Sequence, residues 1–270
     1  MNITAKTFTQ IPPIAVISGD KITIGGSARD IHSCLQTENI RRSNAFIVHD
    51  PCGCLKKRYR GVLERHGYRI KTLDTTCGAV SARYNPFSYI RDNGGVTELA
   101  DAVIRGTSGN SDSDDYGFLL TEWLLLKTIF GYIHENALDY EKNFDTALEM
   151  LKSMEIIEGL EDSNTPVDYM MDSLEGRDPF NSTVLRYRHY KTTPYAKDNR
   201  ILESCAERLA PLVTKQALDL MSEDELCFDE WSYCNTALFV RTDVNCPHLE
   251  FLTPLMYSQF FSTAYEQAVK

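Results

Sequence analysis

The feature that most restricts the fold of this chain is a strand–helix–strand pattern. A long helical stretch separates this pattern from the next strand along the chain. Residues 45–48 (AFIV) form a short apolar run of the kind found in buried strands. A run with apolar residues at helical spacing follows and stops at Gly67, and residues 68–74 (YRIKTLD) form the next predicted strand. A strand, a helix and a strand within about thirty residues predict a right-handed parallel crossover.

The middle of the chain, residues 94–229, is predicted to be almost wholly helical. A buried strand returns at residues 235–240 (NTALFV), and a last helix then has Pro247 near its start and Pro254 as a candidate kink. The separate elements expected besides these are strands at 14–18 and 21–24 and helices at 96–104, 116–136, 143–153, 165–175 and 196–213. The pattern predicts an α/β fold in which an all-helical insertion interrupts a parallel sheet.

We therefore expect two domains. Residues 1–93 and 230–270 are expected to form an α/β domain, and residues 94–229 an inserted all-helical domain. The chain has 270 residues, of which 43% are hydrophobic, so it can bury a sizeable core. Its net charge of −10 argues against a uniformly basic nucleic-acid-binding surface, although it leaves room for a local basic patch.

The N-terminus, the most apolar stretch and the cysteines together predict a cytoplasmic protein. The N-terminus lacks a charged segment followed by a long apolar core, so we expect no signal peptide. The most apolar stretch, residues 118–133, contains Glu122 and Lys127 and is too short and too charged to span a bilayer. The eight cysteines are scattered and form no CxxC pair, which favours reduced thiols.

The turn after residues 45–48 carries the densest set of reactive side chains. His49, Asp50 and Pro51 are followed there by Cys52, Gly53 and Cys54. Nucleotide enzymes place phosphate-handling groups where a buried strand ends, so this is a candidate site. Two alternatives stay open: a zinc site in which Cys77 adds a third thiolate, and a Cys–His nucleophile that uses His49.

Phosphate-binding signals are weak elsewhere. Residues 25–30 (GGSARD) offer glycines for a tight turn, but the pattern GxxxxGK[ST] is absent and the dipeptide Gly-Lys occurs nowhere. Two stretches, 56–71 and 186–200, are locally basic, and the second interleaves its cations with tyrosines. Such surfaces can grip single-stranded nucleic acid, although a solvated helix face is the simpler interpretation. The nucleic-acid-binding candidates are Arg186, Arg188, Lys191 and Lys197.

The order of these motifs resembles the nucleotide-binding domain of type IV secretion coupling proteins, the TraG/TraD-like ATPases of conjugation. In that family a strand ends in Asp-Pro-Lys-Gly-Glu, and a helix, a Gly-Tyr strand and an Asn-Pro-x-x-Tyr-Ile turn follow. The resemblance covers about residues 14–270. The matching residues are Asp50, Pro51, Gly53, Gly67, Tyr68, Asn85, Pro86, Phe87, Tyr89, Ile90, Tyr187, Lys191, Lys197, Ser204, Arg208, Leu209 and the segments 235–240 and 255–268.

The chain also departs from the family pattern. Gly25, Gly26 and Ser27 stand where the phosphate loop should open, but the segment with the lysine and the following hydroxyl is missing. Cys52 and Cys54 replace the lysine and glutamate of Asp-Pro-Lys-Gly-Glu. Asn235 replaces the lysine of the family's Lys-Thr-Ala-Leu-Phe strand, and the chain stops before the strand that carries the Walker B carboxylates.

The resemblance implies a partial RecA-like sheet of the P-loop NTPase type with an inserted all-α domain. It implies a degenerate nucleotide site at Gly25, Gly26, Ser27, Asp50 and Gly53, without ATPase activity in this chain alone. The family uses ATP and Mg²⁺, assembles as a hexamer at the inner face of the cytoplasmic membrane and links relaxosome proteins and DNA to the secretion channel. We expect no cofactor for this chain alone.

Three other interpretations stay open. The chain could be a non-catalytic module that binds relaxosome proteins or single-stranded DNA, an unrelated α/β enzyme, or a non-functional remnant. Because the parallel sheet lacks its next strand, its open edge predicts poor solubility or self-association.

Overall fold

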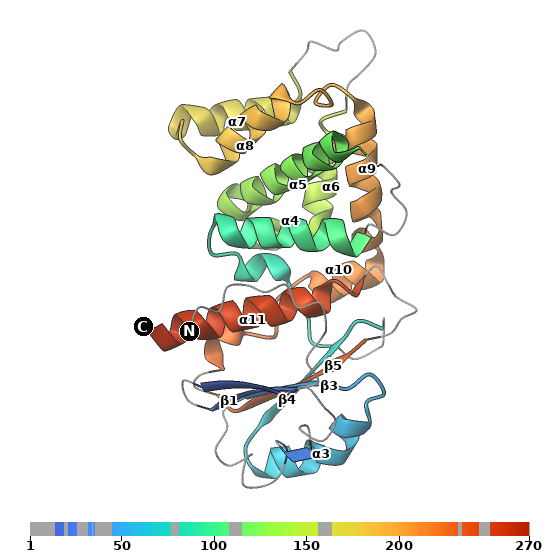
Figure 1. Cartoon of the computed structure of the whole chain (residues 1–270), viewed down its shortest axis with the longest axis vertical. Coiled ribbons are helices and arrows are strands. Elements are labelled where there is room, and N and C mark those ends of the chain that lie inside the picture. The colour runs from blue at the N-terminus through green and yellow to red at the C-terminus, as the bar shows by residue number, and fades with distance from the viewer. Residues whose placement is uncertain are drawn as a thin grey trace. The chain divides into compact units, whose positions relative to one another are not determined.

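The computed structural model describes ten segments of the chain: residues 14–18, 21–25, 32–33, 35, 45–76, 81–107, 115–155, 164–231, 234–242 and 249–269. The chain divides into two compact units. We call Met1–Tyr84 with Glu223–Lys270 the sheet unit, and Asn85–Ser222 the helical unit (Figure 1).

The helical unit starts and ends earlier than the sequence prediction of 94–229. At its start, the Asn85 side chain donates a hydrogen bond to the carbonyl oxygen of Lys142 at 2.9 Å, which joins this residue to the helices. After its end, the Lys71 ammonium donates to the carbonyl oxygens of Glu225 and Leu226 at 2.5 and 2.9 Å. These bonds attach the segment after Ser222 to the sheet unit.

The sheet has five described strands in the order β2-β1-β3-β5-β4. β5 pairs in parallel with β3 and with β4, whereas β1 pairs antiparallel with β2 and with β3. The predicted α/β class is confirmed, but the sheet is mixed rather than parallel, because strands two residues apart in sequence can pair only antiparallel. The strands are β1 Ile14–Ser18, β2 Lys21–Gly25, β3 Ala45–His49, β4 Arg69–Asp74 and β5 Thr236–Arg241.

The helix α3 (Cys54–Arg65) connects β3 to β4, as the sequence predicts, but the two strands are not neighbours. β5 lies between them, with Thr236 opposite both Ala45 and Arg69. Gly67 adopts a φ of 78°, a left-handed conformation that glycine tolerates best, and this allows the chain to turn from α3 into β4.

The two faces of the sheet carry different helices. α3 lies on one face and α11 (Leu252–Val269) on the other (Figure 1). Phe46 and Val48 of β3 and Phe239 of β5 belong to the buried cluster that includes Leu63 of α3. Pro254 is the third residue of α11, where its missing N–H has no partner to lose, so it does not kink the helix as the sequence suggests. Pro247 lies outside the described residues.

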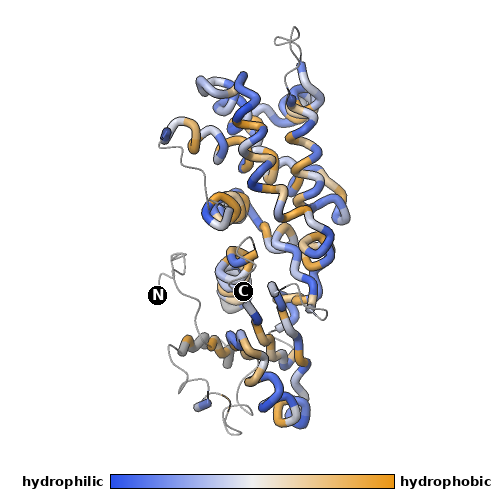
Figure 2. Tube along the Cα trace, turned by 90° about the vertical axis from the view of Figure 1, so that its right-hand side faces the viewer, coloured by the Kyte–Doolittle hydropathy of each residue, from blue (hydrophilic) through white to orange (hydrophobic). Residues whose placement is uncertain are grey.

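The helical unit is built around one long buried helix, α5, which packs against α4, α6, α8 and α9. Figure 2 shows hydrophobic and hydrophilic residues alternating along these helices. Within the part of the chain that the structure describes, no helix has the length and apolarity needed to cross a bilayer. The helices are α4 Asn93–Thr107, α5 Tyr116–Asn136, α6 Phe144–Lys152, α7 Pro166–Arg177, α8 Ser182–Thr192, α9 Asn199–Leu209 and α10 Lys215–Met221.

The region predicted as one helix at 196–213 begins later and changes type. The Asp198 side chain accepts a hydrogen bond from the Arg200 backbone N–H, so α9 starts at Asn199. It ends at Leu209, where the 3₁₀ turn Ala210–Val213 takes over. Pro211 lacks the N–H that an α-helix needs at this position, which accounts for the change.

Candidate functional site

The carboxyl ends of β3 and β5 form the point in the sheet where a ligand site is most expected. The two strands are parallel neighbours, and the helices that follow them lie on opposite faces of the sheet (Figure 1). Open α/β sheets bind ligands at such points. The backbone N–H of Asp50 donates to the Val240 carbonyl oxygen at 2.8 Å, and His49 Nε2 lies 2.9 Å from Thr242 Oγ1. The strand ends are therefore joined by hydrogen bonds.

Asp50 is buried, with 1% of its surface exposed, and holds the start of α3. Its Oδ1 accepts from the Leu55 N–H at 3.1 Å and its Oδ2 from the Lys56 N–H at 2.8 Å. These are N–H groups that the first turn of a helix leaves without partners, and a negative charge there is favourable. Both oxygens of this predicted nucleotide-site carboxylate thus serve a structural role.

Gly53 and Arg241 meet beside this turn. Gly53 has a φ of 69°, and a Cβ atom on it would lie 3.8 Å from Arg241 Nε. Arg241 Nη1 lies 2.9 Å from an oxygen of Asp74, whose side chain is 3% exposed. Its Nε is buried and has no hydrogen-bond partner among the described residues. This edge therefore carries an ion pair that sequence reasoning missed, because its members are 167 positions apart.

His49 and the thiols are not brought together as a nucleophile pair requires. Side chains alternate along β3, so His49 points to the sheet face opposite that of Asp50. Burial lowers the pKa of His49, and the Asp50 charge only partly opposes this effect. The Cys52 Sγ instead lies 3.7 Å from Asp50 Oδ1. The hypothesis of a Cys–His enzyme finds no supporting contact here.

The glycines predicted to open a phosphate loop begin on the same side of the sheet as the carboxyl ends of β3 and β5. Gly25 ends β2 opposite Ile14, which in turn lies opposite Val48 of β3. β2 therefore runs parallel to β3, and its carboxyl end lies about 10 Å away with β1 between them. Gly26 and Ser27 lie outside the described residues, as does Cys77 of the zinc hypothesis. In the described segments no three histidine, cysteine or carboxylate side chains are placed to hold a metal ion.

The basic candidates of the helical unit lie on or just after α8. Arg188 forms an ion pair with Glu175 of α7. The Lys191 ammonium lies 2.9 Å from Asp168 Oδ1, also on α7. Lys197 is exposed in the turn that follows α8. Two of the four cations are thus neutralised by carboxylates of the same unit.

Arg186 is held differently, over the surface of α5. Its Nη1 donates to Asn93 Oδ1 at 2.9 Å and its Nη2 to Thr183 Oγ1 at 2.8 Å. The guanidinium lies directly over Gly131, since a Cβ atom there would come within 2.3 Å of Nη2. Burial lowers the pKa of Arg186. This side chain is built into the α5–α8 contact.

Of the three tyrosines interleaved with these cations, Tyr195 is partly exposed, but the other two do not offer open rings. Tyr187 and Tyr190 are buried, with 6% and 2% of their surfaces exposed. The Tyr187 hydroxyl donates to Asp168 Oδ1 at 2.8 Å. Burial raises the pKa of Asp168, but hydrogen bonds from Lys191, Thr165 and Tyr187 outweigh it and lower the pKa to about 2. The cluster therefore works mainly to join α7 to α8.

A buried ion pair lies between α5 and α9, and the sequence analysis did not predict it. Glu122 and Arg208 have side chains 1% and 4% exposed. Arg208 Nη2 lies 2.9 Å from Glu122 Oε2, and Nε donates to Oε1 at 3.1 Å. The Ser204 hydroxyl also donates to Oε1. Glu122 within an apolar run was the sequence signal for it.

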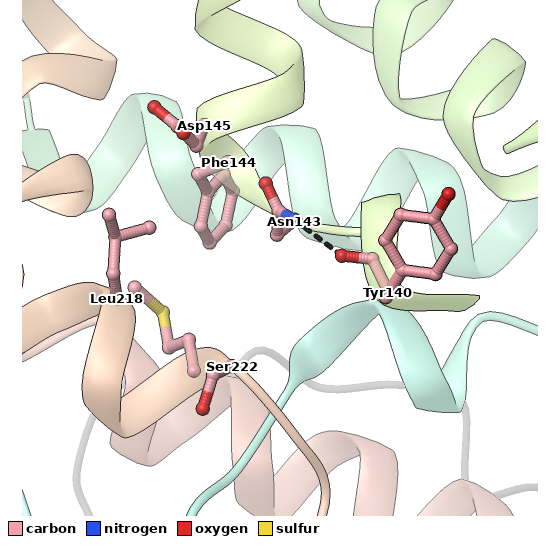
Figure 3. Close-up of a pocket in the computed structure, with 7 residues that line it drawn as sticks. Tyr140, Asn143, Phe144, Asp145, Leu218 and Ser222 are labelled. Atoms are coloured by element: carbon pink, nitrogen blue, oxygen red, sulfur yellow. Dashed lines mark hydrogen bonds between the residues drawn. The ribbon is translucent and has the colours of Figure 1, made fainter. Parts of the chain in front are cut away.

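The helical unit has one described hollow worth noting, of about 220 Å³. Figure 3 shows the hollow with Phe144 above it, Leu218 on the left, Tyr140 on the right and Ser222 below. The Asn143 amide donates to the Tyr140 carbonyl oxygen at 3.0 Å and so shapes the rim. The walls of this hollow mix polar and apolar side chains and hold no convergent set of catalytic groups.

Comparison of the chain with protein-family models gave no match, and comparison with curated proteins gave none either.

Proposed function

We propose that this chain is an accessory protein of conjugative type IV secretion, similar to a coupling protein. In this proposal the helical unit binds a protein of the relaxosome, and the sheet unit is a RecA-like remnant that does not hydrolyse ATP alone. The proposal combines the sequence resemblance with the two-unit architecture. The order of strand, Asp-Pro-x-Gly turn, helix, strand, helical insertion and strand supports it, because the same order is implied by the resemblance.

The observation that carries the protein-binding part is the set of exposed aromatic side chains on the helical unit. Phe180, Tyr116, Tyr140 and Tyr169 are 86%, 78%, 74% and 62% exposed. Aromatic residues are enriched at interfaces and supply much of their binding energy. By contrast, two of the three tyrosine rings of the predicted nucleic-acid surface are buried and two of its four cations form ion pairs, so we favour a protein partner over single-stranded DNA.

The lack of hydrolysis follows from what phosphoryl transfer needs. The reaction requires a lysine at the β/γ-phosphates, and Mg²⁺ held by a hydroxyl and a carboxylate. The sequence has no Gly-Lys pair, and both oxygens of Asp50 already accept backbone hydrogen bonds. We expect no saturable binding of labelled ATP in the presence of Mg²⁺. Micromolar affinity with turnover would contradict this part of the proposal.

The binding test uses the relaxase and the full-length coupling protein of the element that encodes this chain. Each is titrated against the purified chain by biolayer interferometry. We expect binding that does not depend on nucleotide and that Tyr140→Ala or Phe180→Ala weakens at least tenfold, or by about 1.4 kcal/mol. Tyr265→Ala is the matched control, since Tyr265 is 55% exposed but lies on α11 of the sheet unit.

Two outcomes would reject the protein-binding role. One is the absence of any binding to either protein. The other is salt-dependent binding of single-stranded oligonucleotides that Lys191→Ala and Lys197→Ala abolish, which would support a nucleic-acid role instead.

A further inference from the structure

The turn between β3 and α3 presents two thiols to solvent within three residues. Cys52 and Cys54 are both exposed, and only Gly53 separates them. The left-handed conformation of Gly53, together with the hydrogen bond from its N–H to the Asp50 carbonyl oxygen at 3.0 Å, folds the chain back on itself. This brings the two cysteines onto one side of the same tight turn.

Contacts of the sulfur atoms show how the two cysteines are held within the turn. The Cys54 thiol lies 3.9 Å from the Cys52 carbonyl oxygen and the Cys52 thiol 3.7 Å from Asp50 Oδ1. A hydrogen bond with the Cys52 side chain, and the charge that side chain can carry, raise the pKa of Cys54. The other described cysteines differ, because Cys205 is fully buried and Cys227 and Cys234 are partly covered.

We propose that Cys52 and Cys54 form a dithiol site that exchanges with low-molecular-weight disulfides and closes reversibly to an intramolecular disulfide. The inference uses only the geometry of this turn and does not depend on the proposed secretion function.

The exchange proceeds in two balanced steps. The thiolate of one cysteine attacks a sulfur atom of the small disulfide RSSR, forms a mixed disulfide and releases RS⁻. The thiolate of the second cysteine then attacks the protein sulfur of the mixed disulfide and releases the second RS⁻. In total the dithiol loses two electrons and two protons, and RSSR becomes two RSH.

Two features of the turn define the behaviour of the site. Because the pKa of Cys54 is raised, little thiolate is present near neutral pH, and exchange should accelerate as the pH rises. Cys54 is also the first residue of α3. A bond from it to Cys52 closes a small ring at the helix start, and strained or exposed disulfides are easily reduced. The site is therefore suited to reversible rather than structural oxidation.

The test uses the full chain, fully reduced and then incubated with glutathione disulfide. Free thiols are trapped by alkylation, and each cysteine is located by peptide mass spectrometry. We expect the peptide with Cys52 and Cys54 to lose both alkylation sites and two hydrogen atoms, and excess reduced glutathione to restore it. In Cys54→Ser we expect a stable glutathione adduct on Cys52, because no second thiol can displace it.

Cys227→Ser and Cys234→Ser serve as controls and should leave closure unchanged. The inference is overturned by glutathione adducts on both cysteines without ring closure, by pairing of either with a third cysteine, or by no reaction at either thiol. A titration with a monosubstituted trivalent arsenical, which needs two adjacent thiols, gives a second measurement. Failure to bind one equivalent at this peptide would also contradict the inference.

Discussion

The ion pair between Glu122 and Arg208 makes the sharpest stability prediction. Arg208→Met keeps an unbranched side chain of similar length but removes two charge-assisted hydrogen bonds to Glu122. Each bond of this type contributes about 1.5–3 kcal/mol. The carboxylate left behind is 1% exposed and still accepts a hydrogen bond from the Ser204 hydroxyl. Breaking a buried pair in this way costs about 3–5 kcal/mol, and we expect a loss in this range.

The double substitution Glu122→Leu with Arg208→Met separates charge pairing from packing. With both charges gone, no buried ion lacks a partner, and replacing such a pair by apolar residues is often neutral or stabilising. We expect the double variant to lie within about 2 kcal/mol of the wild type, since the Ser204 hydroxyl and the Ile104 carbonyl oxygen, which each lose a hydrogen-bond partner, are neutral groups rather than buried charges. Each single variant should be less stable than the double variant.

The assay is urea unfolding followed by far-ultraviolet circular dichroism. Hydrogen exchange of peptides from α5 and α9 assigns the loss to the helical unit. The reasoning is refuted if Arg208→Met costs less than about 1 kcal/mol, or if the double variant is the least stable of the set.

Three further predictions concern named positions elsewhere. Gly131→Ala should destabilise the α5–α8 contact by about 1–2 kcal/mol, because its Cβ would lie 2.3 Å from Arg186 Nη2. The Cβ of Gly176→Ala on α7 would meet nothing within 4 Å, so this control should stabilise the protein slightly, and thermal melts of both variants check the difference. Asp50→Ala should cost about 1–2 kcal/mol by removing the acceptor of two N–H groups of α3, as urea midpoints would show, and an unchanged midpoint would contradict the capping role. The folded pKa of Asp168 is about 2, whereas an unfolded aspartate titrates near 3.9, so the contribution of Asp168 to stability is present above about pH 4 and is lost as the pH falls through about 2. Pepsin cleavage within α7 should rise over this pH window, and Asp168→Asn should remove the pH dependence.

Local patterns predicted the elements well where one signal dominated. The apolar run before Asn136 follows Asp115, whose side chain accepts from the N–H groups of Gly117 and Phe118, and α5 matches the predicted range 116–136. β3 was likewise placed by a short apolar run, and β4 by its position directly after the helix that Gly67 ends. In contrast α8 was not predicted as a separate helix, because its apolar residues do not gather on one face and its basic residues suggested a surface.

Contacts between distant parts of the chain account for what the sequence did not reveal. Periodicity places β5 in a sheet but carries no information about which strands it separates. Likewise Asp50 could be located at a strand end, but Arg241, which completes that edge, comes from β5. The cations of α8 looked free in sequence because their partners, Asp168 and Glu175, belong to the preceding helix.

The position of β5 between β3 and β4 has a consequence for how the chain is made. β3 and β4 leave the ribosome early, but they are not paired with each other, because both pair with β5. β5 is synthesised about 190 residues after β3, as the register of Ala45 with Thr236 shows. The whole helical unit is translated in between and can fold first, since domains generally fold as units during synthesis. The sheet unit must wait with two open strand edges, so its vulnerable period lasts until β5 has left the ribosome.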